Sequence, residues 1–168
     1  MSAVYSTPRL HWRPLVAADH AVVYRQFSDA DMCTFFSEPA CSWADAGDII
    51  THYAGDRSER SSARWGLFDL QSGAFIGTCG YHFYDRTAGN VELGYDVWKD
   101  YWRRGYGSEA LGGLLALCAE RLVVSLVYTM IHPDNTASIR LAQRHGFSES
   151  PLLRPIDTTP TVCLARAL

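Results

Sequence analysis

The spacing of apolar residues changes several times along the chain between the period of a helix and that of a strand. In residues 9–13 apolar and polar positions alternate, which predicts a half-buried strand that stops at Pro14. Apolar residues at helical spacing then predict two helices, over residues 19–28 and 42–55. Each begins at a residue type, Asp or Ser, that caps helix N-termini.

In the middle of the chain, apolar and polar residues alternate with a period of two residues, as in a strand. Residues 65–70, 74–84 and 90–97 are predicted strands. The segments between them, residues 69–73 and 85–89, are rich in Asp, Gly, Ser and Thr, which favour tight turns. The simplest arrangement of three strands joined by short turns is an antiparallel meander.

The second half mixes helices with buried strands. It predicts a helix over 107–122, a strand over 123–131, a short helix over 135–145 that ends at Gly146, and a strand over 159–165. Gly112 and Gly113 each cost about 1 kcal/mol relative to Ala inside a helix, so we expect another segment to approach that helix closely there.

Composition limits the function classes. The chain has 168 residues with 15 Lys plus Arg, 18 Asp plus Glu and a net charge of -3. This length suits one domain over residues 1–168, and the charge does not favour nucleic acid as a partner. No apolar run is long enough to span a membrane. No secretory signal is visible at the start, and the five cysteines form no C-x-x-C pair, so we expect a cytoplasmic protein with reduced thiols and no metal.

One loop stands out for its chemistry. Gly105 and Gly107 open the long helix directly after Arg103 and Arg104. Glycines allow successive N–H groups to turn toward one point, and a helix N-terminus carries about half a positive charge. The loop is therefore a candidate site for a phosphate or a pyrophosphate.

Three interpretations of this loop remain open on the residues alone. Residues 105–110 match the dinucleotide pattern G-x-G-x-x-G/A, but a buried parallel strand directly before it and an acidic residue about 20 positions later are both missing. A Walker loop is excluded because no lysine follows the glycines. The loop could also be a purely structural turn, and the third interpretation uses the rest of the second half.

Downstream of the loop come the strand over 123–131, then His132-Pro133-Asp134-Asn135-Thr136-Ala137-Ser138, and later His145-Gly146-Phe147. With this order and spacing the chain resembles the GNAT family of acyl-CoA-dependent N-acetyltransferases. Pro8-Arg9-Leu10, Arg13-Pro14-Leu15 and Asp19 resemble the start of its ribosomal-protein N-terminal (RimJ/RimL-type) branch. The resemblance covers nearly the whole chain. It implies an α/β (α+β) single-domain GNAT fold, with a mixed, mostly antiparallel central sheet flanked by about four helices.

The resemblance also implies site residues. The backbone of the strand that precedes the loop would contact the pantetheine arm of acetyl-CoA, the loop would hold the pyrophosphate, and Asn135 would cap its helix or reach the cofactor. The implied cofactor-binding residues are Gly94, Tyr95, Asp96, Val97, Arg103, Arg104, Gly105, Tyr106, Gly107, Ser108 and Asn135. Glu109 is expected only to complement the helix dipole. Two positions depart from the family: Trp102 replaces a frequent Gln or Arg, and Ala142 stands where many members have a tyrosine as general acid.

The chemistry of acetyl transfer selects the candidate catalytic residues. An amine must be neutral to attack a thioester, which costs about 1 kcal/mol at pH 7 for an α-amine and about 4.6 kcal/mol for a lysine. Glu92 is the candidate general base, acting through water, or an outward residue that pairs with an arginine. His82, Asp96 and His132 are weaker candidates. Ser138 is the candidate donor to the leaving thiolate, or a residue that only packs in its helix.

The acceptor is expected to be a protein N-terminus or a small-molecule amine, with no nucleic acid or membrane partner, and the protein to be a monomer or homodimer. Aromatic residues are expected to line the acceptor side, namely some of Phe35, Phe36, Trp43, Tyr53, Trp65, Tyr81 and Tyr84. The missing tyrosine leaves a second interpretation open, a module that binds acyl-CoA without turnover.

Overall fold

The computed structural model describes residues 5–36, 38–54, 61–153 and 160–168, and these form a mixed sheet with helices on both faces. The elements are β1 (Tyr5–Ser6), β2 (Leu10–Arg13), α1 (His20–Ser28), α2 (Ala30–Cys33), α3 (Trp43–His52), β3 (Ala63–Asp69), β4 (Phe75–Asp85), β5 (Asn90–Val97), α4 (Tyr106–Arg121), β6 (Leu126–Ile131), α5 (Thr136–Arg144), β7 (Ser148–Glu149) and β8 (Val162–Ala167). Two short 3-10 turns, Ala17–Asp19 and Lys99–Tyr101, precede α1 and follow β5. The predicted α/β fold class is confirmed.

The strands lie in the order β1-β2-β3-β4-β5-β6-β8-β7. Every neighbouring pair is antiparallel except β5 and β6, so the predicted meander of β3, β4 and β5 is confirmed. Its turns form as their composition predicts. Asp69 Oδ1 accepts hydrogen bonds from the backbone N–H groups of Gln71 and Ser72, and Asp85 Oδ1 accepts two in the same way from Thr87 and Ala88.

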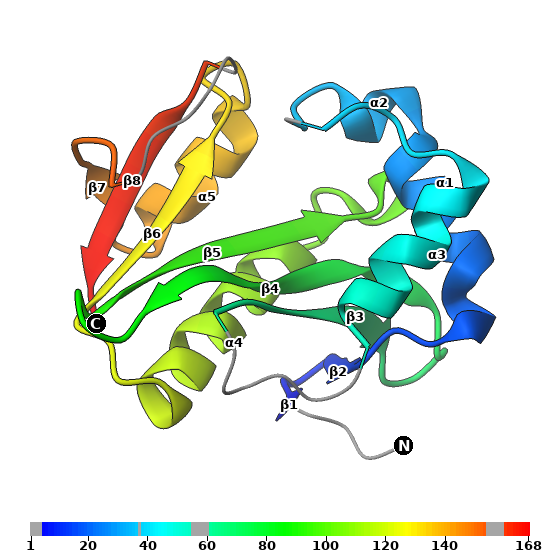
Figure 1. The fold of residues 1–168 in the computed structure, drawn as a ribbon, viewed down its shortest axis with the longest axis horizontal. Helices are drawn as coiled ribbons and strands as arrows, with labels where there is room; N and C mark the ends of the chain where they lie inside the picture. The colour runs from blue at the N-terminus through cyan, green and yellow to red at the C-terminus, as the bar shows by residue number, and fades with distance from the viewer. Residues whose placement is uncertain (1–4, 37, 55–60, 154–159) are drawn as a thin grey trace.

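The parallel pair at the centre of the sheet is short. β5 and β6 pair only at Asn90 with Leu126, Val91 with Val127, and Glu92 with Tyr128. Beyond Glu92 the described residues of the two strands form no further pairs. Figure 1 shows β5 and β6 side by side near the C-terminus and then separating, with α5 beside β6 and α1 to α3 at the far end of β5. This separation opens one edge of β5 in the middle of the sheet.

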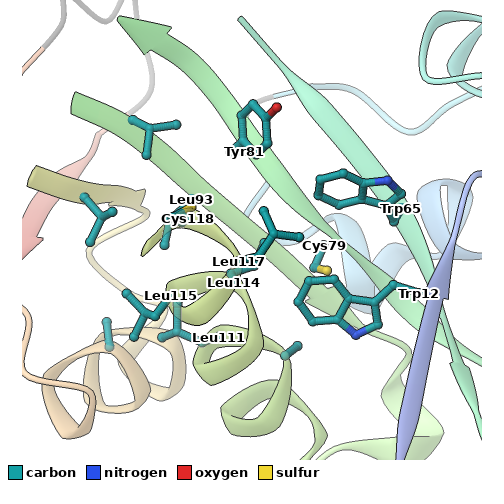
Figure 2. Close-up of a cluster of buried hydrophobic side chains, with 14 of the residues drawn as sticks. Trp12, Trp65, Cys79, Tyr81, Leu93, Leu111, Leu114, Leu115, Leu117 and Cys118 are labelled. Atoms are coloured by element: carbon teal, nitrogen blue, oxygen red, sulfur yellow. The ribbon is translucent and has the colours of Figure 1, made fainter. Parts of the chain in front are cut away.

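The two faces of the sheet carry separate cores. Trp65 belongs to the larger cluster, which includes Trp12 and the leucines of α4, while the next residue, Gly66, faces Leu15 and Phe68 of the cluster under α1 and α3. Figure 2 shows the rings of Trp12, Trp65 and Tyr81 with Leu111, Leu114 and Leu117 of α4. The predicted close approach to α4 is present, since an ideal Cβ at Gly113 would lie 2.6 Å from Trp12 Cζ2.

The element boundaries differ from the prediction in a few places. The strand predicted over 123–131 begins only at Leu126, because the chain needs the preceding residues to turn from α4 back to the sheet, and Val123 is 61% exposed. The last strand is shifted, since β8 starts at Val162 and continues to Ala167 to pair along all of β6. Part of its predicted start, and residue 55 at the end of the second helix, lie outside the described residues. The prediction missed α2 and the two-residue strands β1 and β7, which are too short to show a period.

Candidate active site

The N-terminus of α4 presents free backbone donors at the end of β5. Its N-cap, Gly105, has a φ of 83°, in the left-handed region that favours glycine, and it has no side chain that could cap the helix. By contrast, α2, α3 and α5 are capped by the side chains of Asp29, Ser42 and Asn135. The first N–H groups of an α-helix have no acceptor within the helix. A donor set of this kind fits a phosphate or pyrophosphate.

The side chains of the loop point in different directions. Arg103 and Arg104 are exposed, and Arg103 also has a positive φ, of 59°. Trp102, which departs from the family pattern, donates from Nε1 to the carbonyl oxygen of Val97 at 2.6 Å and so holds the loop against β5. The hydroxyl of Tyr106 donates to Asp69 Oδ2 at 3.0 Å, away from the helix axis. Tyr106 therefore offers the site its backbone rather than its side chain.

Ser108, in the first turn of α4, is linked to the end of α5. Its Oγ lies 2.8 Å from Nε2 of His145. Burial lowers the pKa of His145, and the positive charges of Arg166 and Arg144 lower it further. The neutral imidazole can accept the hydroxyl proton of Ser108. This contact joins the two helices that flank the gap between β5 and β6.

The open edge of β5 offers backbone groups at alternate residues. The N–H of Trp98 donates to the carbonyl of Ile76 on the β4 side at 2.7 Å, and the register from Val97 back to Glu92 is regular. Because hydrogen-bonding directions alternate along a strand, Asp96 and Gly94 also face β4, whereas Val97, Tyr95 and Leu93 face the gap. The backbone groups left for a ligand in the gap are the carbonyl of Leu93, both groups of Tyr95 and the N–H of Val97. The Val97 carbonyl already accepts from Trp102 Nε1, and the Leu93 N–H belongs to the last β5–β6 pair.

Tyr95 crosses the gap with its side chain. Its hydroxyl lies 3.0 Å from Ser138 Oγ, in the first turn of α5. Burial raises the pKa of Tyr95 to about 12, and the hydrogen bond with Ser138 lowers it slightly. Asn135 Oδ1 accepts the N–H of Ser138 at 3.1 Å, so Asn135 is an N-cap, as one of its two expected roles required. Tyr95 was predicted to act only through its backbone, and the role of its phenol was not predicted.

The opposite face of β5 carries a buried polar cluster. The guanidinium of Arg64 is paired with Asp96, donates from Nε to Thr78 Oγ1 at 2.9 Å, and lies with Nη1 3.4 Å from His82 Nε2. Gly94 lies beneath it, where an ideal Cβ would be 3.7 Å from the His82 ring. Oδ2 of Asp96 accepts from both Arg64 and the hydroxyl of Thr78, and an oxygen engaged in this way argues against Asp96 as a general base.

Glu92 lies on this same face, directly opposite His82 in the β4–β5 register. Side chains of directly opposed residues have Cβ atoms about 4.5–5.5 Å apart. Glu92 is at the last β5–β6 pair, where the two strands begin to separate. The acid–base candidates Glu92 and His82 are thus neighbours at the base of the gap.

His132 is the remaining candidate base, and it follows the end of β6. Its Nδ1 accepts the backbone N–H of Asp134 at 3.2 Å, so this nitrogen is already engaged. Its ring lies 5.5 Å from that of Phe35, which comes from the segment after α2. His132 therefore helps to bring the α2 segment and the end of β6 together, and we give it no proton-transfer role.

The seven aromatic residues considered for the acceptor side separate into three groups. Trp65 and Tyr81 are not among those that can line the acceptor side, because both are fully buried on the α4 face, in the main core. Trp43 packs on the ring of His20 at the surface of α3 and is 57% exposed, and the hydroxyl of Tyr84 accepts the N–H of Val123 near the C-terminal end of α4. Only three remain near the polar face: Tyr53 contacts the ring of His82, Phe35 that of His132, and Phe36 that of Phe27 under Arg64.

Three further features of the described part of the chain concern metal-binding groups, disulfides and membrane-spanning helices. It contains no group of three or more His, Cys, Asp or Glu residues that could hold a metal ion. All five cysteines are free thiols. Among the described residues, no helix is both long and apolar enough to span a membrane.

Known proteins share this fold. The family model of the acetyltransferase (GNAT) domain matches residues 9–148. The uncharacterized N-acetyltransferase p20 of Bacillus licheniformis is 28% identical over 158 residues, covering 94% of this chain and 88% of its own length. The ribosomal α-N-protein acetyltransferase RimL, solved with coenzyme A, superposes with a TM-score of 0.84 at 14% identity, covering 99% of this chain and 98% of that one. Spermidine N-acetyltransferase from Vibrio cholerae, solved with CoA and spermine, gives 0.80 at 14% identity and 96% coverage of each chain.

The match to the family model spans most of the chain, and the fold agrees along its whole length. The resemblance drawn from the glycine loop, the Asn135 helix and the His145-Gly146-Phe147 end is thereby confirmed. This chain belongs to the GNAT family of acetyltransferases, which are acyl-CoA-dependent acyltransferases.

Proposed function

We propose that this protein transfers the acetyl group of acetyl-CoA to a primary amine, either a protein N-terminal α-amine or a small-molecule amine. The observation that carries the proposal is the separation of β5 from β6 beside the uncapped N-terminus of α4. It leaves an open strand edge next to a set of anion-binding donors. A long ligand with a pyrophosphate at one end and an amide-containing arm at the other matches both.

The proposal gives each part of acetyl-CoA its contacts. The N–H groups of residues 105–108 bind the pyrophosphate, and the exposed Arg103 and Arg104 add positive charge beside it. The pantetheine amides pair with the gap-facing backbone groups that Trp102 and β6 leave free, namely the carbonyl of Leu93, both groups of Tyr95 and the N–H of Val97. Because Gly94 and Asp96 direct their backbone groups toward β4, they support this edge rather than bind the arm. Asn135 stabilises the first turn of α5 on the far side of the gap.

Catalysis on this proposal begins with the amine. Glu92 accepts a proton from the incoming ammonium through water, and the neutral nitrogen attacks the thioester carbonyl carbon. A gap-facing N–H of β5 stabilises the negative oxygen that develops on that carbon. The C–S bond then breaks, and the nitrogen releases its second proton to water as the amide forms. The sulfur of CoA leaves with a proton from the pair described next, which water then reprotonates. Holding amine and thioester together supplies much of the rate enhancement.

The proton for the leaving sulfur comes from the Tyr95–Ser138 pair. Ser138 and Ala142 are four residues apart and so share one face of α5. Tyr95 brings a phenol from β5 to that face, which compensates for the absence of a tyrosine at Ala142. A phenol with a pKa of about 12 stays protonated throughout the physiological range and can donate a hydrogen bond to the thiolate. This pair favours an enzyme over a module that only binds acyl-CoA.

The acceptor class follows from the chemistry that structural neighbours share. RimL is described as an acetyltransferase of protein α-amines, and the spermidine enzyme was solved with spermine. Both acceptors are primary amines. The net charge of -3 mildly favours a cationic acceptor for this chain as well. We place the reaction in the cytoplasm, where the five free thiols would stay reduced.

Thermal unfolding with and without ligand tests the proposal first. At 100 times its Kd a ligand adds about 2.7 kcal/mol, which raises Tm by about 5 to 11 °C for a chain of this length. We expect this shift with acetyl-CoA and none with NAD. A shift with NAD alone would overturn the proposal and restore the dinucleotide interpretation of the loop. Binding of acetyl-CoA without turnover on a broad panel of α-amines, polyamines and amino acids would instead support the binding module.

A further inference from the structure

A carboxylate in the first turn of α4 is bound by the segment before β2. Glu109 Oε1 accepts hydrogen bonds from Thr7 Oγ1 at 2.6 Å and from the backbone N–H of Arg9 at 2.7 Å. Its Oε2 accepts from Arg9 Nε at 2.7 Å. The Glu109 side chain is only 12% exposed. Glu109 was expected only to complement the helix dipole, and that prediction missed this network of contacts 100 residues apart in the sequence.

Arg9 uses its remaining donors on the glycine loop itself. Its Nη1 donates to the carbonyl oxygen of Arg104 at 2.9 Å. Its Nη2 lies against Gly105, where an ideal Cβ would be 3.3 Å away, and its guanidinium covers the ring of Tyr106 at 4.4 Å. A single side chain thus contacts three consecutive residues of the loop and is itself fixed by Glu109.

The hydrogen bond to Arg104 has a directional consequence. The described chain contains no cis peptide bond. In a planar trans peptide the C=O and the following N–H point in opposite directions. Because Arg9 holds the Arg104 carbonyl on its own side, the N–H of Gly105 is directed away from Arg9. Loss of this contact would free the peptide to rotate at a glycine, whose backbone angles are the least restricted.

We propose that Arg9 and Glu109 are positioning residues that hold the 103–108 loop in its anion-binding conformation, so that they determine the affinity for the pyrophosphate of acyl-CoA. The proposal rests on the proposed function, since it concerns the same loop. It assigns a task to the Pro8-Arg9-Leu10 segment, which the acetyl-transfer chemistry leaves unexplained. Neither side chain needs to touch the ligand.

A second ion pair, made by Arg13 at the end of β2, provides a matched control. Arg13 donates from Nη1 and Nη2 to Asp19 at 2.7 and 2.8 Å, and this pair is more buried than that of Arg9. Its contacts are with Asp19, Pro14 and Phe68, all outside the loop. Removing Arg13 should therefore lower stability at least as much as removing Arg9, without altering the loop.

The experiment compares Arg9→Ala, Arg9→Lys, Glu109→Gln and Arg13→Ala with the unaltered protein. Each is assayed for kcat and KM with acetyl-CoA and for kcat/KM with S-acetylpantetheine, which has the same reacting thioester and arm but no pyrophosphate. We expect Arg9→Ala and Glu109→Gln to raise KM for acetyl-CoA about tenfold or more, with kcat little changed. The same variants should leave kcat/KM for S-acetylpantetheine within about twofold of the unaltered value. Arg9→Lys should recover part of the loss, because it keeps the charge but loses the planar fork.

The outcomes separate the inference from the proposed function. If the unaltered protein binds no acetyl-CoA, the proposed function fails and the inference fails with it. If the unaltered protein is active but KM for acetyl-CoA is unchanged in both Arg9→Ala and Glu109→Gln, only the inference is overturned. It is also overturned if Arg13→Ala raises this KM as much as Arg9→Ala, or if the two thioesters lose activity equally. Glu109→Gln keeps the size of the side chain, and Arg13→Lys replaces Arg13→Ala if the latter does not fold.

Discussion

The hydroxyl of Tyr95 on β5 and Oγ of Ser138 on α5 lie 3.0 Å apart, across the gap that separates β5 from β6. They are 43 residues apart in the sequence, and both residues are partly buried. This bridge is placed where the sulfur of a bound thioester would leave on the proposed mechanism. Either of its two hydroxyls can donate a proton to the leaving sulfur.

Removal of the phenol tests that role. We expect Tyr95→Phe to lower kcat about 10- to 100-fold, because the thiolate then leaves without its proton donor, while KM for acetyl-CoA stays within about threefold. Ser138→Ala should lower kcat less, since the phenol remains. The measurement is steady-state release of the CoA thiol with a good amine acceptor. Tyr24→Phe on α1 is the control, and an unchanged kcat in Tyr95→Phe would exclude the donor role.

The pH profile adds a second check on the same residue. Burial raises the pKa of Tyr95 to about 12, so the phenol keeps its proton well above the ordinary value for tyrosine. We therefore expect kcat to show no decline from tyrosine ionisation up to about pH 10. A basic limb with a midpoint near pH 9 that is absent from Tyr95→Phe would contradict the assignment.

The general-base role of Glu92 predicts a dependence on the acceptor. An α-amine with a pKa of about 7.8 needs little help to lose its proton at pH 7, whereas an alkylamine with a pKa of about 10.4 needs about 3.5 kcal/mol more. Glu92→Gln should therefore lower kcat/KM severalfold for α-amines and by a clearly larger factor for alkylamines. A panel of amines at fixed pH measures this. Equal losses for both classes would show that Glu92 only supports the sheet beside His82.

Two adjacent glycines of α4 are expected to respond oppositely to the same change. Gly113→Ala places a methyl group 2.6 Å from the Trp12 ring, and such overpacking costs about 1 to 3 kcal/mol, or about 2 to 12 °C in Tm. Gly112→Ala meets only His145 Cε1 at 3.5 Å, an ordinary contact, and should gain up to about 1 kcal/mol of helix propensity. The measurement is Tm of the two variants and of the unaltered protein by thermal unfolding. Equal stabilities would contradict the packing argument.

These glycines also show what could be predicted from the sequence. Local features were sufficient for the meander, its Asp-initiated turns and the open helix start at Gly105, because each depends on residues within one turn or one period. The glycine pair also predicted that some segment approaches α4 closely, but not that this segment contains Trp12. The family resemblance added the order of the motifs. The sequence alone therefore predicted which backbone segments form the candidate site.

The side-chain pairs could not be predicted, because each joins segments distant in sequence. Arg64 with Asp96, Arg9 with Glu109, and Tyr95 with Ser138 depend on strand order and on the angle of α5. The same limit explains why the sequence could not show which of the seven aromatic candidates, such as Trp65 and Tyr81, lie in the core. Alternation shows that a strand residue points to one face, but not which helix covers that face.

His145 predicts how stability depends on pH. Burial, followed by the charges of Arg166 and Arg144, lowers its pKa, and its neutral ring contacts Ser108 at 2.8 Å. As pH falls below about 6.5 the unfolded chain takes up this proton before the folded one, so His145 destabilises the fold under acidic conditions. We expect Tm of His145→Gln to fall less than that of the unaltered protein between about pH 7.5 and 5.5, because the amide does not titrate in this range and can still accept the hydroxyl proton of Ser108. Parallel curves for the two proteins over this interval would show that protonation of His145 does not couple to folding.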